Sequence, residues 1–260
     1  MMLKDKVAVI TGIGPGMGTE IALLFAREGA KLIIGARNEA RIEKLAKELR
    51  DKGHDVIAKT TDLTSRDSCR GIVEAAIEAY GGVDILVQNG HDPGDYKSIE
   101  EADPEQWRRV MDCNFFGAMH LVQVSTPSMI ERGGGEIILV NSGASFLPHV
   151  GLASYAASKA ALESLVRSLA IELGPKGIRA NGIHLGLVEG ENVESWVSML
   201  AERQQQSVEE VRAAIVAREY PVGHIPTAQE CAGTVLYLAS DLSKPVIGQA
   251  LMVNGGSLLR

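Results

Sequence analysis

The stretch Thr11-Gly12-Ile13-Gly14-Pro15-Gly16-Met17-Gly18 decides the fold of this 260-residue chain. It follows an apolar run at residues 7–10, which is typical of a buried strand, and it precedes residues 21–26, which have helical periodicity. Glycines in such a turn let the backbone approach a pyrophosphate, and the first turn of the next helix offers free N–H groups. The order strand, glycine loop, helix therefore predicts a dinucleotide-binding loop.

Strand and helix patterns alternate along the rest of the chain. Strands are predicted at residues 6–11, 31–35, 55–60, 84–88, 136–141, 178–184 and 248–253. Helices are predicted at residues 17–28, 38–52, 66–80, 104–131, 153–174 and 228–240. Several strands are continuous apolar runs, as is typical of parallel strands that helices cover on both faces. We expect an α/β fold with one doubly wound parallel sheet of about seven strands and helices on both faces.

Residues 1–260 are expected to form a single dinucleotide-binding catalytic domain. The segment 185–226 interrupts the regular alternation, because it is long, helical in pattern and locally polar at Gln204-Gln205-Gln206. Long insertions at the carboxyl edge of such a sheet often cover the ligand crevice. We therefore predict that residues 185–226 form a substrate-binding lid.

Composition argues against several classes of function. The net charge is −7 and the chain has no Lys/Arg tract, so no nucleic-acid partner is expected. No apolar run approaches the roughly 18 residues that a membrane span needs. The first residues run directly into a strand, without the pattern of a signal peptide. The three cysteines are widely spaced and fit no zinc pattern, so no metal is predicted. A cytoplasmic location without membrane attachment is the resulting expectation.

Tyr155 and Lys159 are the residues most directly suited to chemistry. They stand one helical turn apart in a predicted helix, so they share a face. A phenol with a pKa near 10 is a poor acid or base at neutral pH, but a nearby ammonium favours the phenolate and lowers that pKa. An alcohol must lose its hydroxyl proton when a hydride leaves its carbon, and the reverse reaction must supply one. The pair therefore predicts an acid/base centre at Tyr155.

These features together resemble the short-chain dehydrogenase/reductase family, whose members are Rossmann-fold oxidoreductases. The resemblance covers essentially the whole chain. It implies reversible hydride transfer between a nicotinamide cofactor and a small-molecule alcohol or carbonyl substrate. The residues that carry it are the glycine loop, Asp62, Asp84-Ile85-Leu86-Val87 leading to Asn89, Asn114, Ser142, Tyr155-Ala156-Ala157-Ser158-Lys159, Ile178-Arg179-Ala180-Asn181 and residues 248–256.

The family pattern also implies roles for single residues. The implied catalytic tetrad is Asn114, Ser142, Tyr155 and Lys159. In it, Ser142 hydrogen-bonds the substrate oxygen, Asn114 holds a proton-relaying water, and Lys159 also bonds the nicotinamide ribose. A homo-oligomer, either a dimer or a homotetramer, is implied through residues 104–131 and 153–174. The implied cofactor-binding residues are Gly12, Pro15, Gly16, Met17, Gly18, Arg37, Asp62, Leu63, Asn89, Gly90, Tyr155, Lys159, Gly186 and Val188.

The preferred cofactor follows from one position. An acid about twenty residues after the glycine loop would bond the ribose 2′-hydroxyl of NAD and repel the 2′-phosphate of NADP. This chain has Ala36 and Arg37 there, and a guanidinium suits a phosphate. The sequence therefore favours NADP(H) over NAD(H). NAD(H) stays the alternative, in which Arg37 only begins the next helix in solvent.

Four positions depart from the family pattern. His91 stands where glycine is usual, Leu185 where proline is usual, Gly190 where a threonine commonly bonds the nicotinamide, and Asn254 where an acid is usual. None of these belongs to the predicted proton-moving group. A different class of function is a nucleotide-sensing regulator that binds the cofactor without chemistry. Such a protein is expected to lose part of the tetrad, which is complete here, so an oxidoreductase is the leading hypothesis.

Overall fold

A computed structural model describes residues 1–259, apart from the side chain of Asn192. In this part of the chain the centre is a seven-stranded, fully parallel sheet of order β3-β2-β1-β4-β5-β6-β7. The order reverses between β1 and β4, where open α/β sheets bind ligands at the carboxyl ends of the strands. The expected fold class is confirmed. The strands are β1 (Val7–Thr11), β2 (Lys31–Ala36), β3 (Val56–Thr60), β4 (Ile85–Gln88), β5 (Gly135–Ser142), β6 (Ile178–Leu185) and β7 (Ala250–Val253).

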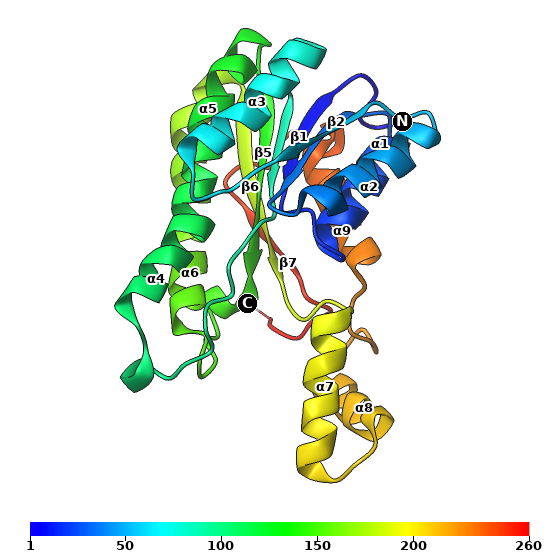
Figure 1. Cartoon of the computed structure of the whole chain (residues 1–260), viewed down its shortest axis with the longest axis vertical. Coiled ribbons are helices and arrows are strands. Elements are labelled where there is room, and N and C mark those ends of the chain that lie inside the picture. The colour runs from blue at the N-terminus through cyan, green and yellow to red at the C-terminus, as the bar shows by residue number, and fades with distance from the viewer. Residues whose placement is uncertain (260) are drawn as a thin grey trace.

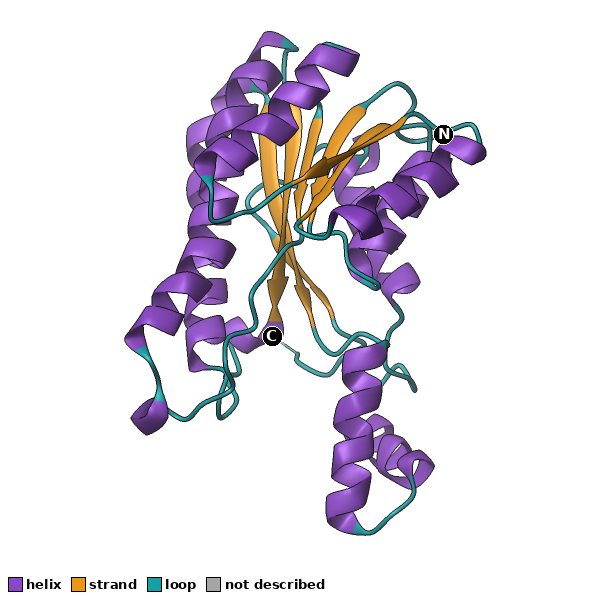
Figure 2. Cartoon of the chain, viewed as in Figure 1, coloured by secondary structure: helices purple, strands orange, loops and turns teal. Residues whose placement is uncertain are grey.

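Helices cover both faces of the sheet (Figures 1 and 2). One face carries α1 (Met17–Arg27), α2 (Glu39–Asp51) and α9 (Ala228–Ala239). The other face carries α3 (Arg66–Tyr80), α5 (Gly117–Glu131) and α6 (Ala153–Leu173). The remaining helices are α4 (Pro104–Met111), α7 (Glu191–Gln204) and α8 (Val208–Glu219). Within residues 1–259, none of the helices combines the length and the apolar character that crossing a bilayer requires.

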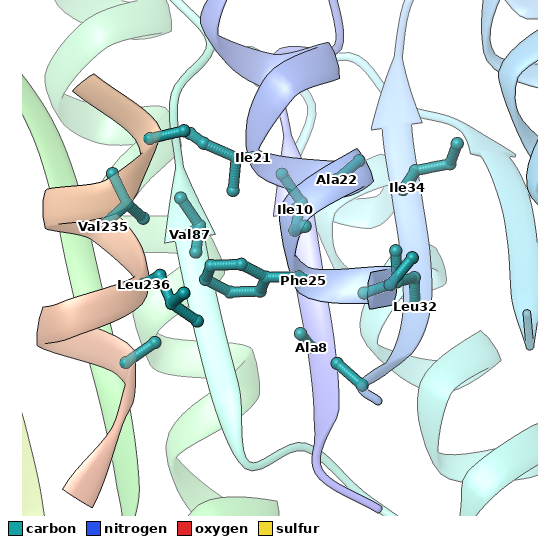
Figure 3. Packing of buried hydrophobic residues seen from close by; sticks show 14 of the residues in the cluster. Ala8, Ile10, Ile21, Ala22, Phe25, Leu32, Ile34, Val87, Val235 and Leu236 are labelled. Carbon is teal, nitrogen blue, oxygen red and sulfur yellow. The ribbon is translucent and has the colours of Figure 1, made fainter. Parts of the chain in front are cut away.

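Alternate residues of each strand contribute to two separate cores, because successive side chains point to opposite faces. Phe25 of α1 is fully buried and packs among Ile10 and Val87 of the sheet and Val235 and Leu236 of α9 (Figure 3). Removing such a side chain costs about 3–5 kcal/mol. This packing fixes α1 against the sheet and so places the glycine loop that precedes it.

Most predicted bounds agree with the structure within one residue, but two elements differ further. The helix expected at 104–131 is interrupted, because α4 ends at Met111 and a π-helical turn (Asp112–Phe116) precedes α5. Such turns insert an extra residue into a helix and are frequent at functional sites, and Asn114 lies in this one. The strand expected at 248–253 begins only at Ala250. Gly248 has φ +70°, a left-handed conformation that a strand cannot contain.

Residues 185–226 form the least embedded part of the fold. α7 and α8 project beyond the carboxyl edge of the sheet (Figure 1). Their apolar faces pack on each other in a small core that includes Val197 of α7, Ile215 of α8 and Tyr220 after it. Ser207 and Glu210 form a capping box that begins α8. This helical pair therefore carries its own packing at the ligand edge of the sheet.

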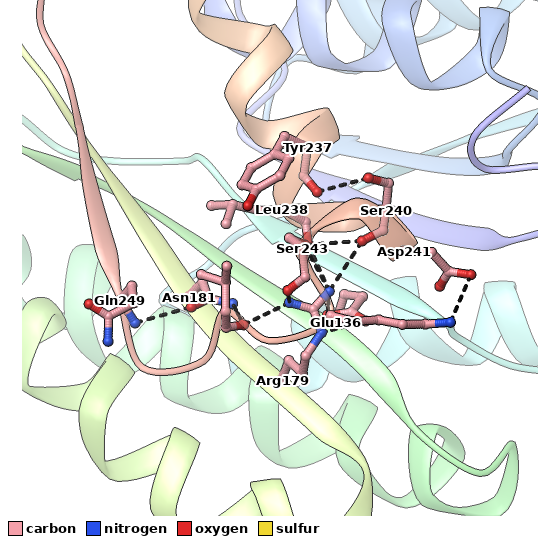
Figure 4. Close-up of polar contacts among 11 residues, drawn as sticks. Glu136, Arg179, Asn181, Tyr237, Leu238, Ser240, Asp241, Ser243 and Gln249 are labelled. Atoms are coloured by element: carbon pink, nitrogen blue, oxygen red, sulfur yellow. Dashed lines mark hydrogen bonds and ion pairs between the residues drawn. The ribbon is translucent and has the colours of Figure 1, made fainter.

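Arg179 on β6 fastens the end of α9 and the loop before β7 to the sheet (Figure 4). Its guanidinium donates to the backbone carbonyls of Ser243 and Val246, both at 2.8 Å. It also lies 2.8 Å from a carboxylate oxygen of Glu136 on the neighbouring strand β5. A buried charge is tolerated when it is paired and hydrogen-bonded in this way. The network holds the chain in position for its final strand.

Candidate active site

The first and last glycines of the loop are required by close packing. Gly12 has φ +78°, and a Cβ on it would lie 2.1 Å from the backbone nitrogen of Gly90. A Cβ on Gly18 would lie 2.3 Å from the carbonyl oxygen of Gly12. Asn89 Nδ2 donates to that same carbonyl oxygen at 2.7 Å. The glycine loop thus packs against the turn that follows β4, through a hydrogen bond from Asn89 and close contact with Gly90.

The middle glycines face open space instead. A Cβ on Gly14 or Gly16 would meet no atom within 4 Å. Gly16 is the N-cap of α1 and no side chain caps this helix end, so the backbone there is available to an anion. Thr19 steadies the loop by donating from Oγ1 to the Gly14 carbonyl at 2.6 Å. The Met17 side chain lies in the core, so its predicted cofactor contact falls to its backbone N–H.

The residues expected around the adenosine end follow β2 and β3. Arg37 comes directly after β2 and is exposed to solvent. Leu63 is buried, and its side chain occupies the space beside Gly90 and Gly117. Asp62 is exposed, and its Oδ1 accepts from the backbone N–H and hydroxyl of Thr64 at 2.9 and 2.8 Å. Asp62 therefore stabilises its own turn, while Leu63 forms a wall under the crevice.

Residues after β6 complete the same edge of the sheet. Gly186 follows Leu185, and a Cβ on it would lie 3.0 Å from Asn254 Cβ and from Ser257 Oγ. This close approach explains a glycine at position 186. Val188 packs against the core on the face of the sheet that α1, α2 and α9 cover. Both residues follow the carboxyl end of β6, and their contact with the nicotinamide end of a cofactor stays a prediction.

The tertiary structure brings the predicted tetrad to one place. Ser142 ends β5, Tyr155 and Lys159 lie on α6, and Asn114 lies in the π turn before α5. The Lys159 Nζ is 5.6 Å from the centroid of the Tyr155 ring. The Ser142 side chain lowers the pKa of the Tyr155 phenol as a polar neighbour of that phenol. A phenol, a hydroxyl and an ammonium therefore share one corner of the sheet edge.

Lys159 is almost completely buried, with 2% of its surface exposed. Its Nζ donates to the Val140 carbonyl at 2.8 Å. Burial disfavours the charged form and lowers the pKa of the lysine to about 8. The Val140 carbonyl on β5 thus holds the ammonium in place. This bond uses one of the three N–H groups of the ammonium.

The pKa of Tyr155 moves in the direction opposite to our expectation. Burial raises it to about 12, and the Ser142 side chain only partly opposes this rise. The lowering that we expect from Lys159 together with an oxidised nicotinamide is not found in the protein alone, where desolvation of the phenol is the largest effect. In this arrangement Tyr155 is a neutral phenol that can donate a proton.

Asn114 is fully buried and its side chain is held at both ends. Its Oδ1 accepts from the Asp92 backbone N–H at 2.7 Å. Its Nδ2 donates to the Asp92 carbonyl and to Ser158 Oγ, both at 2.9 Å. Ser158 in turn donates to the Tyr155 carbonyl at 2.7 Å. Asn114 therefore connects the loop after β4 to the helix that carries Tyr155.

Two residues near the tetrad were missed by sequence reasoning. Ser158 links Asn114 to the Tyr155 backbone, and its place between Tyr155 and Lys159 could have indicated this role. His184 of β6 lies within 3.1 Å of the Ser142 carbonyl through its Nδ1. Only the pairing of β5 with β6 reveals that contact, since the two residues are far apart in sequence.

His91, a departure from the family pattern, lies beside the proposed acid/base. Its ring and that of Tyr155 meet edge to face, with centroids 5.9 Å apart. The surrounding crevice walls desolvate the imidazole, and Lys159 opposes a second positive charge, so its pKa falls to about 4. Although the residue keeps contact with solvent, its ring is neutral at physiological pH.

Comparison with known proteins agrees with this Rossmann-like sheet and its glycine loop. The family model "short chain dehydrogenase" matches residues 6–201, so the chain belongs to the short-chain dehydrogenase/reductase family of oxidoreductases acting on CH–OH and C=O groups. The 7alpha-hydroxysteroid dehydrogenase of Escherichia coli K12 is 34% identical over 260 residues, which cover 99% of this chain and 96% of that protein.

Solved structures of reductases also resemble this chain in fold and sequence. An L-sorbose reductase from Gluconobacter frateurii, complexed with NADPH and L-sorbose, is 30% identical and covers 100% of both chains with a TM-score of 0.93. An actinorhodin polyketide ketoreductase with NADPH is 33% identical, covers 97% of both chains and has a TM-score of 0.89. The likeness therefore extends over the whole sheet and residues 185–226.

Proposed function

We propose that this protein interconverts a carbonyl compound and its alcohol with NADP(H), and that Tyr155 is the general acid/base. The observation that carries the proposal is the joint position of Tyr155, Ser142 and Lys159 at the sheet edge that also bears the open glycine loop. A nicotinamide cofactor supplies or accepts the hydride when it is bound. The chain's own residues must then bind the substrate oxygen and move one proton.

In the direction of reduction, the substrate carbonyl oxygen accepts hydrogen bonds from Ser142 Oγ and Tyr155 Oη. The carbonyl carbon gains a hydride while the Tyr155 hydroxyl gives its proton to the oxygen, which yields the alcohol and a phenolate. The buried Lys159 ammonium stabilises that phenolate in a low-dielectric setting. The phenol recovers its proton from solvent, and the proposed route passes a water held near Asn114. Alcohol oxidation reverses each step.

The residues present fit a phosphate-bearing nucleotide. Gly14 and Gly16 leave the space that the phosphates need, and the uncapped start of α1 offers N–H groups to them. Arg37 is exposed at the end of β2, where an acid would select NAD, and its guanidinium favours a 2′-phosphate. The NADPH bound in the two similar structures supports NADP(H). Use of NAD(H) by the same fold is the alternative.

The remaining features complete the proposal. Residues 1–260 act as one catalytic domain in the cytoplasm, and residues 185–226 form its substrate lid. The protein is proposed to form a dimer or homotetramer through α4, α5 and α6. Exposed apolar surface supports this interface, since Phe116 of the π turn is 39% exposed and lines a hollow of about 430 Å³ with Trp107 and Met111 of α4.

The direct test is oxidation of NADPH, followed at 340 nm, with cyclohexanone, trans-2-decalone, ethyl acetoacetate and L-sorbose as carbonyl substrates and NADH as the comparison cofactor. The Tyr155→Phe variant should lose turnover by a factor of about 10³ or more while it still binds NADPH. Tyr80→Phe is the matched control, because Tyr80 ends α3 beside Lys31 at the start of β2, at the opposite edge of the sheet. Retained turnover in Tyr155→Phe refutes the acid/base assignment.

A further inference from the structure

The residues after β7 return to the edge of the sheet where Ser142 lies. Leu258 is partly buried, and its Cδ2 lies 3.8 Å from the position that a Cβ on Gly143 would occupy. Gly143 directly follows Ser142 in the loop after β5. Figure 2 shows this segment beside the carboxyl ends of the central strands. Leu258 is therefore an apolar neighbour of the loop proposed to bind the substrate oxygen.

Asn254 holds this segment in place. Its side chain is buried, its Nδ2 donates to the Leu258 carbonyl at 2.9 Å, and its Oδ1 accepts from the Gly256 N–H at 3.0 Å. The first of these bonds requires an amide. An aspartate of the same shape could still accept from Gly256, but it would place a carboxylate against the Leu258 carbonyl. The hydrogen bond to the Leu258 carbonyl therefore depends on an asparagine at position 254, where the family usually has an acid.

The same segment contacts both ends of the lid. At the entering end, a Cβ on Gly186 would lie 3.0 Å from Asn254 Cβ and from Ser257 Oγ, so the two stretches pack closely. The Val222 N–H donates to the Gly255 carbonyl at 3.2 Å. Residues 254–258 therefore bridge the chain entering the lid, the chain leaving it and the loop after Ser142. Contacts with these three parts of the chain fix the position of residues 254–258.

We propose that Leu258 is a specificity-determining wall of the substrate site and that Asn254 is the positioning residue that fixes it. The inference rests on the proposed function, since it takes Ser142 as the group that binds the substrate oxygen. An isobutyl side chain beside Gly143 cannot hydrogen-bond a hydroxylated or charged substituent, and it limits the volume available there. The substrate class is a ketone whose substituent on the Ser142 side is apolar and of limited size.

The test compares cyclohexanone with trans-2-decalone, which share a ring ketone and differ by one fused ring. In Leu258→Ala, the ratio of kcat/KM for the decalone to kcat/KM for cyclohexanone should rise about tenfold. Leu259→Ala is the matched control, because Leu259 is 79% exposed, and it should leave the ratio unchanged. An unchanged ratio in Leu258→Ala, or an equal change in both variants, overturns the role of Leu258.

A second variant tests whether Asn254 positions Leu258. Asn254→Asp should raise KM for cyclohexanone about tenfold with a smaller effect on kcat, because the wall moves while the proton-moving residues stay. Gln229→Glu makes the same chemical exchange at an exposed position of α9 and should have no effect. Wild-type KM in Asn254→Asp contradicts the positioning role.

The wild-type enzyme separates the two proposals. Turnover of L-sorbose together with no turnover of either ring ketone overturns the apolar wall and leaves the proposed function standing. Turnover of none of the four carbonyl compounds overturns the proposed function, and this inference with it. NADPH binding and thermal unfolding of every variant exclude loss of folding as the cause.

Discussion

Replacement of Lys159 by methionine should make the protein more stable and inactive. The lysine is buried with 2% of its surface exposed, and burial lowers its pKa from the ordinary 10.5 to about 8. At about 1.4 kcal/mol for each pKa unit, the folded protein bears a cost of about 3 kcal/mol for keeping this group charged. Methionine fills similar apolar space without a charge.

One loss offsets part of this gain. The Lys159 ammonium donates to the Val140 carbonyl at 2.8 Å, and a hydrogen bond from a charged group contributes about 2 kcal/mol. The net expectation for Lys159→Met is a free energy of unfolding about 1 kcal/mol higher than that of the wild type at pH 7. Turnover should be lost, because no ammonium then stabilises the Tyr155 phenolate.

The pH dependence has a defined sign. Below pH 8 the lysine is protonated in both the folded and the unfolded chain, so the full cost of burial is present. Between pH 8 and 10.5 the folded protein releases this proton while the unfolded chain keeps it, so wild-type stability rises with pH. The advantage of Lys159→Met should therefore shrink and vanish across this interval.

Urea unfolding followed by tryptophan fluorescence at pH 7, 8.5 and 10 measures these differences. Lys176→Met is the matched control, because Lys176 is exposed and its replacement should change stability by less than about 0.5 kcal/mol. A Lys159→Met variant that is less stable than the wild type at pH 7, or an advantage that persists at pH 10, refutes the reasoning.

Three further expectations concern the loop, the cofactor and the assembly. Gly12→Ala should lose at least about 2 kcal/mol of stability, because its Cβ would meet the Gly90 nitrogen and its φ is +78°. Gly16→Ala should fold normally and bind NADPH weakly, so equal melting temperatures of the two variants contradict this difference. Arg37→Ala should weaken NADPH about tenfold and leave NADH unchanged in calorimetric titrations, with the exposed Arg41→Ala as control. Equal losses for both cofactors would remove the phosphate role. Sedimentation velocity should show a dimer or tetramer, and a monomer at micromolar concentration would exclude the proposed interface.

Much of the fold could be predicted because its signals are local. The helix expected at residues 66–80 coincides with α3, since Ser65 accepts from the Ser68 N–H at its start and Gly81 ends it in the left-handed conformation. The π turn around Asn114 could not be predicted, because Asp112–Phe116 contain no glycine or proline and the turn packs against α6, which lies far along the sequence. The late start of β7 at Ala250 follows from the positive φ of Gly248. A glycine in the sequence allows a positive φ but does not require it.

The sequence by itself determined the order of strands and helices, the glycine loop and the spacing of Tyr155 and Lys159, because hydrophobic period and helical geometry depend on neighbours along the chain. Only the tertiary structure decided which distant residues meet. It placed Ser142 against Tyr155, buried the Met17 side chain and set Leu258 beside Gly143. It also raised the pKa of Tyr155 and lowered that of Lys159, since desolvation depends on the atoms that surround a group in space.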